Sequence, residues 1–417
     1  MRWRLRGIVL LVWAGSVAAA QDDLPYEVLL LARSKERMRQ ALSQVLNYTC
    51  LETIQRLARG RHANAFTPLD TVLLEVSTVS SMGNKELLAW PGARRFEDAD
   101  PSSFVSGGLM GTGVFALFAR TVFLNTATTI RYYGDEEMSG RPLARFDFRV
   151  PQVWSGYRIT ANGASATVGI AGSFWIDPAS LELVRMEVRA DEIPAALGLE
   201  RAVTDIDYAR MRIGNSDVLL PQDAKMVLML FSGEVRLNDI AFSHCHEYSA
   251  ESSIRFDMPD PGVPFSTPPV RRVDLPAGLM VSIALETAID STTAHVGDIL
   301  RGHVSGDVRG KGKAIVIPKG AIVTGRIRGL ERAHSPGAAF NLTIELTELE
   351  WETTSAEFYG ELLLKGPARV EGTRGPHAPP IPGTGVLRLT GTQFHVPAGF
   401  RMSWRTLEPN QSLKRSR

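Results

Sequence analysis

The sequence has few cysteines, few histidines and no excess of charge of either sign. Its 417 residues include 2 Cys and 8 His, and 46 Lys and Arg balance 45 Asp and Glu, for a formal net charge of +1. Balanced charge argues against nucleic-acid binding, which needs a concentrated basic surface. Gly-X-Ser-X-Gly, His-Glu-X-X-His and Walker motifs are also absent from the sequence, so we expect a non-enzyme without cofactor or metal.

Long apolar runs are lacking too, apart from one short run near the amino terminus. Three arginines lie within residues 1–6, an apolar segment covers residues 7–17, and alanines at 18–20 suit a cleavage site. This order is typical of a secretory signal peptide, residues 1–20. A membrane anchor is the alternative, but the run is short for one. We expect a periplasmic or secreted protein with no transmembrane segment after cleavage.

The two cysteines, Cys50 and Cys245, are far apart in the chain. An even number of cysteines in an exported protein predicts one disulfide. Closing so long a loop contributes about 5 kcal/mol in the chain-entropy account. Two buried free thiols are the alternative.

The sequence is rich in β-strand patterns. One amphipathic helix, predicted over residues 25–47, precedes about ten strand-like segments that end near residue 256. Asp177 and Pro178 separate two of these segments and favour a tight turn, which predicts a β-hairpin. Apolar and charged residues alternate over residues 184–189, so this strand has one buried and one solvated face. An antiparallel sheet follows from many strands joined by short turns.

A glycine-rich apolar segment at residues 102–121 interrupts the strands. Thr112 suits the cap of a short helix there. The glycines are not followed by the Lys-Ser/Thr pair of a phosphate loop. We expect this helix on or beside a concave sheet, with an apolar ligand bound by the phenylalanines that cluster near it: Phe104, Phe115, Phe118 and Phe123.

Prolines mark a boundary between two domains. Residues 258–276 hold six prolines and predict an extended linker between a domain at 21–257 and a second at 277–405. In the second domain the motifs Leu-Pro-Ala-Gly (275–278), Ile-Pro-Lys-Gly (317–320) and Val-Pro-Ala-Gly (396–399) each precede an apolar segment. They predict tight corners that feed strands of a small β-barrel. The basic tail, residues 406–417, is predicted to be disordered.

Two family resemblances follow from these motifs. The helix, the strands and the sequence Phe-Trp-Ile-Asp-Pro at 174–178, followed by the charged strand at 181–188, resemble the half-barrel of LolA/LolB lipoprotein carriers and RseB-type sensors over about residues 25–257. That resemblance implies a concave face that holds acyl chains, and no family binding residue maps onto this chain. Residues 275–328 are similar to the barrel of VirB10/TrbI-type secretion-channel proteins, which implies a barrel over about 275–405. The inner-membrane anchor and pore-lining helix of those proteins have no counterpart here, so the secretion function is not carried over.

The predicted fold class is therefore mainly β, with an N-terminal helix and an antiparallel half-barrel sheet followed by a second small β-barrel. The leading functional hypothesis is a non-catalytic envelope protein that binds an apolar ligand, a lipid or a lipidated partner on the concave sheet. The alternatives are an envelope interaction or scaffold module that docks a protein partner, and an enzyme of unknown class. His244 and His246 suit one metal ion on a strand, but no third ligand is evident, so we expect solvated histidines. The acidic residues 135–137 are expected in a solvated turn.

Overall fold

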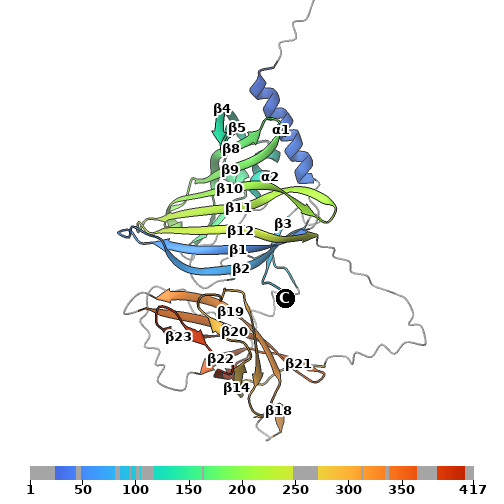
Figure 1. Ribbon diagram of the computed structural model, residues 1–417, viewed down its shortest axis with the longest axis vertical. Coiled ribbons are helices and arrows are strands. Elements are labelled where there is room, and N and C mark those ends of the chain that lie inside the picture. Colours follow the sequence, from blue (N-terminus) through green and yellow to red (C-terminus); the bar gives the residue numbers. More distant parts are fainter. Residues whose placement is uncertain are drawn as a thin grey trace, which may run out of the picture.

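A computed structural model describes residues 24–43, 48–79, 85–93, 95–99, 104, 117–161, 164–247, 271–310, 314–333, 338–363 and 383–408. Two β-sheets, of ten and nine strands, form the body of the protein and lie one beyond the other along its long axis (Figure 1). The predicted fold class is confirmed. The predicted signal peptide lies outside the described residues. Within the described residues, no helix combines the length and apolar character needed to cross a bilayer.

Helix α1 (Tyr26–Ser43) forms because its apolar residues recur on one side. Leu30, Met38 and Leu42 are buried together with Ser34, at a spacing of four residues. That spacing places them on one face of an α-helix. On the opposite face Arg39 donates hydrogen bonds to Glu36. The helix confirms the prediction over the described part of residues 25–47.

The ten-stranded sheet is antiparallel throughout, in the order β3-β2-β1-β12-β11-β10-β9-β8-β5-β4. Because β1 lies between β2 and β12, the first and last strands of this domain are neighbours. The strands are β1 (Tyr48–Arg59), β2 (Thr67–Val79), β3 (Lys85–Ala89), β4 (Thr129–Met138), β5 (Arg141–Val150), β8 (Gly169–Asp177), β9 (Glu182–Asp191), β10 (Leu199–Ile213), β11 (Ser216–Leu230) and β12 (Val235–Glu247).

The hairpin β8–β9 and the disulfide are confirmed as predicted. Asp177 accepts a hydrogen bond of 2.9 Å from the Ala179 amide, which closes the turn. Cys50 on β1 is bonded to Cys245 on β12. The disulfide therefore joins two strands that are also paired along their length, next to a register shift between Thr49 and Leu51.

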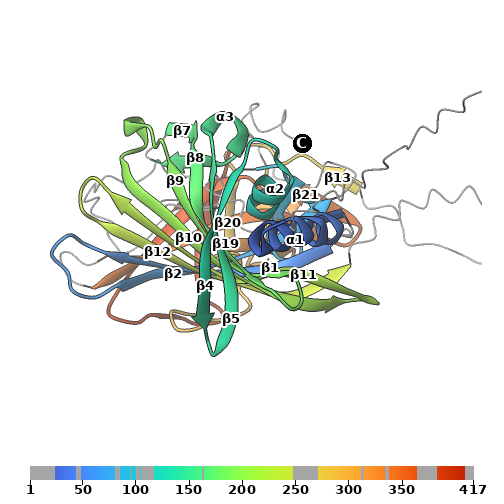
Figure 2. The ribbon, with the colours of Figure 1, turned by 90° about the horizontal axis from the view of Figure 1, so that it is seen from above.

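Small elements cover one side of the curved sheet. They are α2 (Leu117–Leu124), α3 (Gln152–Ser155), the hairpin β6 (Arg158–Ala161) and β7 (Ala164–Thr167), and the 3-10 turn η3 (Ala195–Leu197). Figure 2 shows α1 and α2 side by side within the curve of the sheet, and the two helices contact each other. The predicted short helix is thus present in the described residues from Leu117 onward, while Thr112 and Phe115 lie outside them.

The second sheet curls into a nearly closed barrel, in the order β13-β21-β20-β19-β16-β14-β25-β22 with β23 beside β20. A Cβ on Gly385 of β23 would lie 2.3 Å from Leu362 Cβ of β22, so glycine permits these two strands to approach. The strands are β13 (Arg271–Val273), β14 (Met280–Leu285), β16 (Ile299–Val304), β19 (Ile322–Ala333), β20 (Ala339–Trp351), β21 (Thr354–Glu357), β22 (Gly360–Leu363), β23 (Thr384–Thr390) and β25 (Arg401–Thr406), beside the pairs β15 (Ile289–Asp290) with β24 (His395–Val396) and β17 (Val308–Arg309) with β18 (Ile315–Ile317). Strand β13 lies within the residues predicted as a linker and pairs with β21.

The three proline-glycine corners of this barrel are confirmed. Gly278, Gly320 and Gly399 have φ angles of 87°, 86° and 80°, which favour glycine. One residue separates each glycine from the strand that follows it, which is β14, β19 or β25. The repeated motif therefore sets where three barrel strands begin.

The two domains meet at the edge of β2. The Leu73 amide donates to the Val296 carbonyl, and the Val296 amide donates to the Thr71 carbonyl, both at 2.8 Å. A Cβ on Gly297 would lie 2.7 Å from the Leu73 carbonyl oxygen. The guanidinium of Arg328 lies over the Trp90 ring, with its Cζ 4.9 Å from the ring centre. The barrel thus continues the hydrogen bonding of β2 past the end of its pairing with β3.

Candidate functional site: the concave face of the half-barrel

Residues that alternate along the strands give the ten-stranded sheet an apolar inner face. On β1, for example, the even-numbered residues from Cys50 to Arg56 are buried, while the odd-numbered ones are partly or fully exposed. Strand register aligns such residues in rows across the sheet. The inner apolar residues include Ile54, Val72, Leu74, Phe146, Phe148, Phe174, Met186, Val188, Ile206, Met226, Leu228 and Ile240.

An aromatic cluster occupies the β4–β8 end of this face. Phe146 and Phe174 are stacked with ring centres 5.3 Å apart, and Phe148 lies 6.2 Å from Phe174. From helix α2, Phe123 packs on Phe174 at 4.9 Å. Tyr132 of β4 contacts Phe146 at 5.3 Å. The helix therefore covers a surface made mainly of rings and aliphatic side chains.

The structure brings together two of the four phenylalanines predicted to bind a ligand. Phe118 and Phe123 are buried on α2, and Phe118 packs on Tyr157 at 5.0 Å. Phe104 is buried elsewhere, against Trp90 at 5.2 Å, close to the joint between the domains. Phe115 lies outside the described residues. Ligand binding by these four residues remains a prediction.

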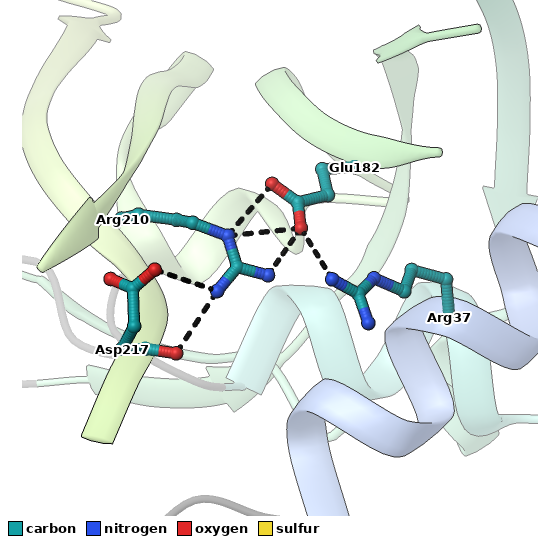
Figure 3. A network of polar contacts seen from close by, with 4 residues as sticks. All are labelled: Arg37, Glu182, Arg210 and Asp217. Carbon is teal, nitrogen blue, oxygen red and sulfur yellow. Dashed lines mark hydrogen bonds and ion pairs between the residues drawn. The ribbon is translucent and has the colours of Figure 1, made fainter. Parts of the chain in front are cut away.

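Helix α1 is attached to the rim of the half-barrel by a polar network (Figure 3). Arg37 of α1 donates to Glu182 of β9 at 2.9 Å. Glu182 also accepts two hydrogen bonds from Arg210 Nε, at 3.0 and 3.1 Å, and Arg210 in turn contacts Asp217. The hydrogen bonds from Arg210, together with Arg37, hold the pKa of Glu182 below its usual value. Three strands and one helix thus meet at a carboxylate that remains charged.

Three charged side chains are buried in the described chain, namely Glu52, Arg56 and Asp70. All three come from β1 and β2 and face the inside of the sheet. Arg56 donates to both oxygens of Asp70, at 2.6 and 2.5 Å. Their side chains are 4% and 0% exposed, so each charge is neutralised away from water.

Glu52 is the third buried charge, and it has no such partner. Its neighbours in register are Leu74 and Phe242, and no hydrogen bond or ion pair to its carboxyl is found within the described residues. Burial, followed by the nearby Glu86 carboxylate, raises the pKa of Glu52 to about 8. The carboxyl is therefore mostly protonated at neutral pH.

Sequence reasoning missed Glu52, although the signal was present. Cys50, Glu52, Ile54 and Arg56 alternate along one strand, and the cysteine predicted to form a disulfide marks the buried side. The alternation therefore placed two charged residues on the buried face. A buried charge at such a position is a candidate for function or for a compensating ion pair.

Two other polar clusters, the acidic residues 135–137 and the pair His244 and His246, were considered as sites from the sequence. The acidic residues 135–137 lie within strand β4, so their prediction as a solvated turn was wrong. Glu136 accepts hydrogen bonds from Trp175 Nε1 and from Arg145, both at 2.8 Å, and these lower its pKa.

His244 and His246 are exposed on β12. Across the described segments, no group of three or more His, Cys, Asp or Glu side chains is arranged to hold a metal ion.

Comparisons with known proteins give distant structural matches. No protein-family model and no curated protein matches the chain. Among solved structures, a DUF1329 family protein from Desulfovibrio piger matches with 11% identity and a TM-score of 0.30, over 55% of this chain and 97% of that one. A putative outer membrane lipoprotein-sorting protein domain from Vibrio parahaemolyticus matches with 11% identity and a TM-score of 0.27, over 54% and 94%. A LolA superfamily protein from Nitrosomonas europaea matches with 12% identity and a TM-score of 0.25, over 52% and 94%. The matches include the superfamily that the first part of the sequence resembles, and at these values they assign the chain to no family.

Proposed function

We propose that this chain is an exported, non-catalytic envelope protein that binds an apolar chain on the concave face of the ten-stranded sheet. The apolar chain belongs to a lipid or to a lipid-modified protein. In this proposal residues 1–20 direct export, residues 21–257 bind, and residues 258–276 lead to the barrel domain at 277–405. The likeness of that barrel to VirB10/TrbI proteins is part of the proposal and extends to its architecture alone.

One observation carries the proposal: short elements, chiefly the helices α1 and α2, cover the apolar inner face. α2 contributes Phe123 to the aromatic cluster and is short. α1 packs through Leu30, Met38 and Leu42, and its ion pair through Arg37, whose side chain is 43% exposed, adds little to stability. Lifting a helix exposes Phe146 and Phe174 without breaking the strand ladders, because the hydrogen bonds of a sheet run between strands. An alkyl chain then replaces helix contacts with contacts of the same kind.

Native mass spectrometry of the protein isolated from its own envelope, and displacement of the neutral fluorophore N-phenyl-1-naphthylamine by decanol, test the proposal. We expect a bound apolar molecule and saturable displacement. Phe174→Ala removes a central ring and is expected to weaken binding about tenfold. Phe340→Ala is the matched control, since it removes an equally buried ring from the barrel domain. The proposal fails if the isolated protein is ligand-free and the fluorophore does not bind, or if both variants lose binding equally while folded.

A second candidate function is the docking of a protein partner, which two exposed side chains favour. Val153 and Trp154 of α3 are 82% and 61% exposed, and the Trp154 carbonyl accepts a hydrogen bond from Asn125 next to exposed Leu124. Exposed apolar groups of this kind are typical of interaction sites. Trp154→Ser would weaken capture of such a partner from an envelope extract and leave decanol binding unchanged. Unchanged capture would count against docking at α3.

A further inference from the structure

The buried charges of the half-barrel define what kind of polar group its interior can accept. Arg56 is the one cation buried in the described part of the chain, and it is already bound through two hydrogen bonds to Asp70. An anionic group that enters the interior would have to displace Asp70 from Arg56. Breaking a buried pair in this way is unfavourable because it leaves a charge without compensation.

Glu52 presents the opposite situation. Its side chain is buried on the same face as Ile54, and its residue exposure is 7%. A carboxyl that lies largely out of water is costly unless a donor bonds to it, so proteins normally supply one. Within the described ranges no donor reaches Glu52, and its register neighbours Leu74 and Phe242 are apolar. The group that would satisfy it is a cation or a donor.

A second unsatisfied group belongs to the same region. The Tyr208 hydroxyl of β10 is buried and makes no hydrogen bond to any described residue. Glu86 of β3 interacts electrostatically with Glu52, with Tyr208 and with Tyr48. Carboxyls and phenols both offer acceptor oxygens to a donor that enters the interior.

We propose that the apolar molecule bound on the concave face carries a protonated amine, which Glu52 receives as an ion pair. This inference rests on the proposed function and specifies its ligand class. A primary ammonium has three donors on one centre, so it can pair with the Glu52 carboxylate and still donate to other acceptor oxygens. The alkyl part lies along the apolar rows that lead to Phe174 and Met186. No bond is made or broken.

Three ten-carbon probes of equal length separate the possibilities. Decylamine, decanol and decanoate are each titrated against the N-phenyl-1-naphthylamine complex of the full mature chain at pH 7.5. We expect decylamine to bind at least tenfold more tightly than the other two, since a charge-assisted hydrogen bond is stronger than a neutral one. Glu52→Gln keeps the size of the side chain and removes its charge, and it should abolish the preference while decanol affinity stays the same.

Glu350→Gln is the matched control, because Glu350 is an exposed carboxylate on β20 of the barrel domain. It should leave the amine preference intact. Equal affinity for decylamine and decanol, tighter binding of decanoate, or an amine preference that survives Glu52→Gln would each overturn the inference and leave the proposed function standing. Failure of all three probes would instead refute binding on the concave face itself.

Discussion

The two domains solve the same problem, that of covering the inner face of a curved sheet, in different ways. In the barrel domain the sheet curls until β22 and β23 come into contact, and Phe340 and Trp404 are buried inside it. In the half-barrel the curve stays open, and α1 and α2 cover it (Figure 2). Paired strands cannot separate without loss of ladder hydrogen bonds, whereas a helix keeps its own hydrogen bonds when it moves. Among the described residues, the first domain is therefore the one whose sheet is covered by elements that can move without breaking it.

The distribution of buried charge repeats the contrast. The three buried charged residues of the described chain belong to β1 and β2 of the half-barrel. In the barrel domain the buried polar residues are uncharged: Thr343, Ser355 and Thr406. Because a buried charge is costly, its presence is more informative than that of a buried hydroxyl. The contrast supports the binding role proposed for the half-barrel.

Removing the disulfide is expected to change the stability of the half-barrel more than any other substitution proposed for the two domains. Replacing Cys50 and Cys245 together by serine should lower the free energy of unfolding of the half-barrel by about 2–5 kcal/mol, because the long loop is no longer closed. Hydrogen exchange read by mass spectrometry distinguishes the domains. Protection should fall in peptides from β1 and β12 and persist in peptides from β14 and β25. An equal fall of hydrogen-exchange protection in both domains would show that they unfold as one unit, which would contradict the contrast between them.

Glu52 gives the stability of the half-barrel a pH dependence. Its pKa is about 8 in the folded state and about 4.3 when unfolded. Since the folded chain then binds more protons between these values, stability falls as pH rises through that window, by up to about 1.4 kcal/mol per pH unit. Urea unfolding between pH 5 and 9 measures this slope.

Glu52→Gln should flatten that profile and make the variant more stable than the parent at pH 9. The charged group that interacts with Glu52 is Glu86, and Tyr48 and Tyr208 interact with Glu86 in turn. Burial raises the pKa values of both tyrosines, so these phenols stay neutral in this range. Glu350→Gln should leave the slope unchanged. A slope that survives in Glu52→Gln would assign the pH dependence to another group.

The smallest expected effect concerns the attachment of α1. Arg37→Ala removes one arm of the network in Figure 3 and leaves Arg210 on Glu182. Because the pair is partly exposed, stability should change by less than about 1 kcal/mol. Stopped-flow fluorescence should nevertheless show faster entry of N-phenyl-1-naphthylamine, since the cover is more easily lifted. Arg405→Ala, which breaks an exposed pair with Glu361 on the barrel, is the control that should leave entry unaffected. An unchanged rate in Arg37→Ala would mean that α1 does not limit access.

Much of the architecture was predictable because its causes are local. The helix at Tyr26–Ser43 follows from apolar residues spaced by four, and the β8–β9 hairpin follows from Asp177 and Pro178. The corner glycines needed no knowledge of the rest of the chain, because a positive φ is a property of one residue. Expectations failed where neighbours in space decide, as for Glu136 of β4, which accepts hydrogen bonds from Arg145 and Trp175 across the sheet.

The sequence by itself determined the mainly β class, the long helix, the turns and the disulfide partners, because periodicity, turn chemistry and a cysteine count act over short range or leave one choice. Tertiary structure alone decided that β1 lies between β2 and β12, that the barrel docks on the edge of β2, and that Arg56 has a partner while Glu52 has none. These outcomes depend on pairings between residues far apart in the chain. The energy of a buried charge is set by the atoms around it, and the chain brings those atoms together only when it folds.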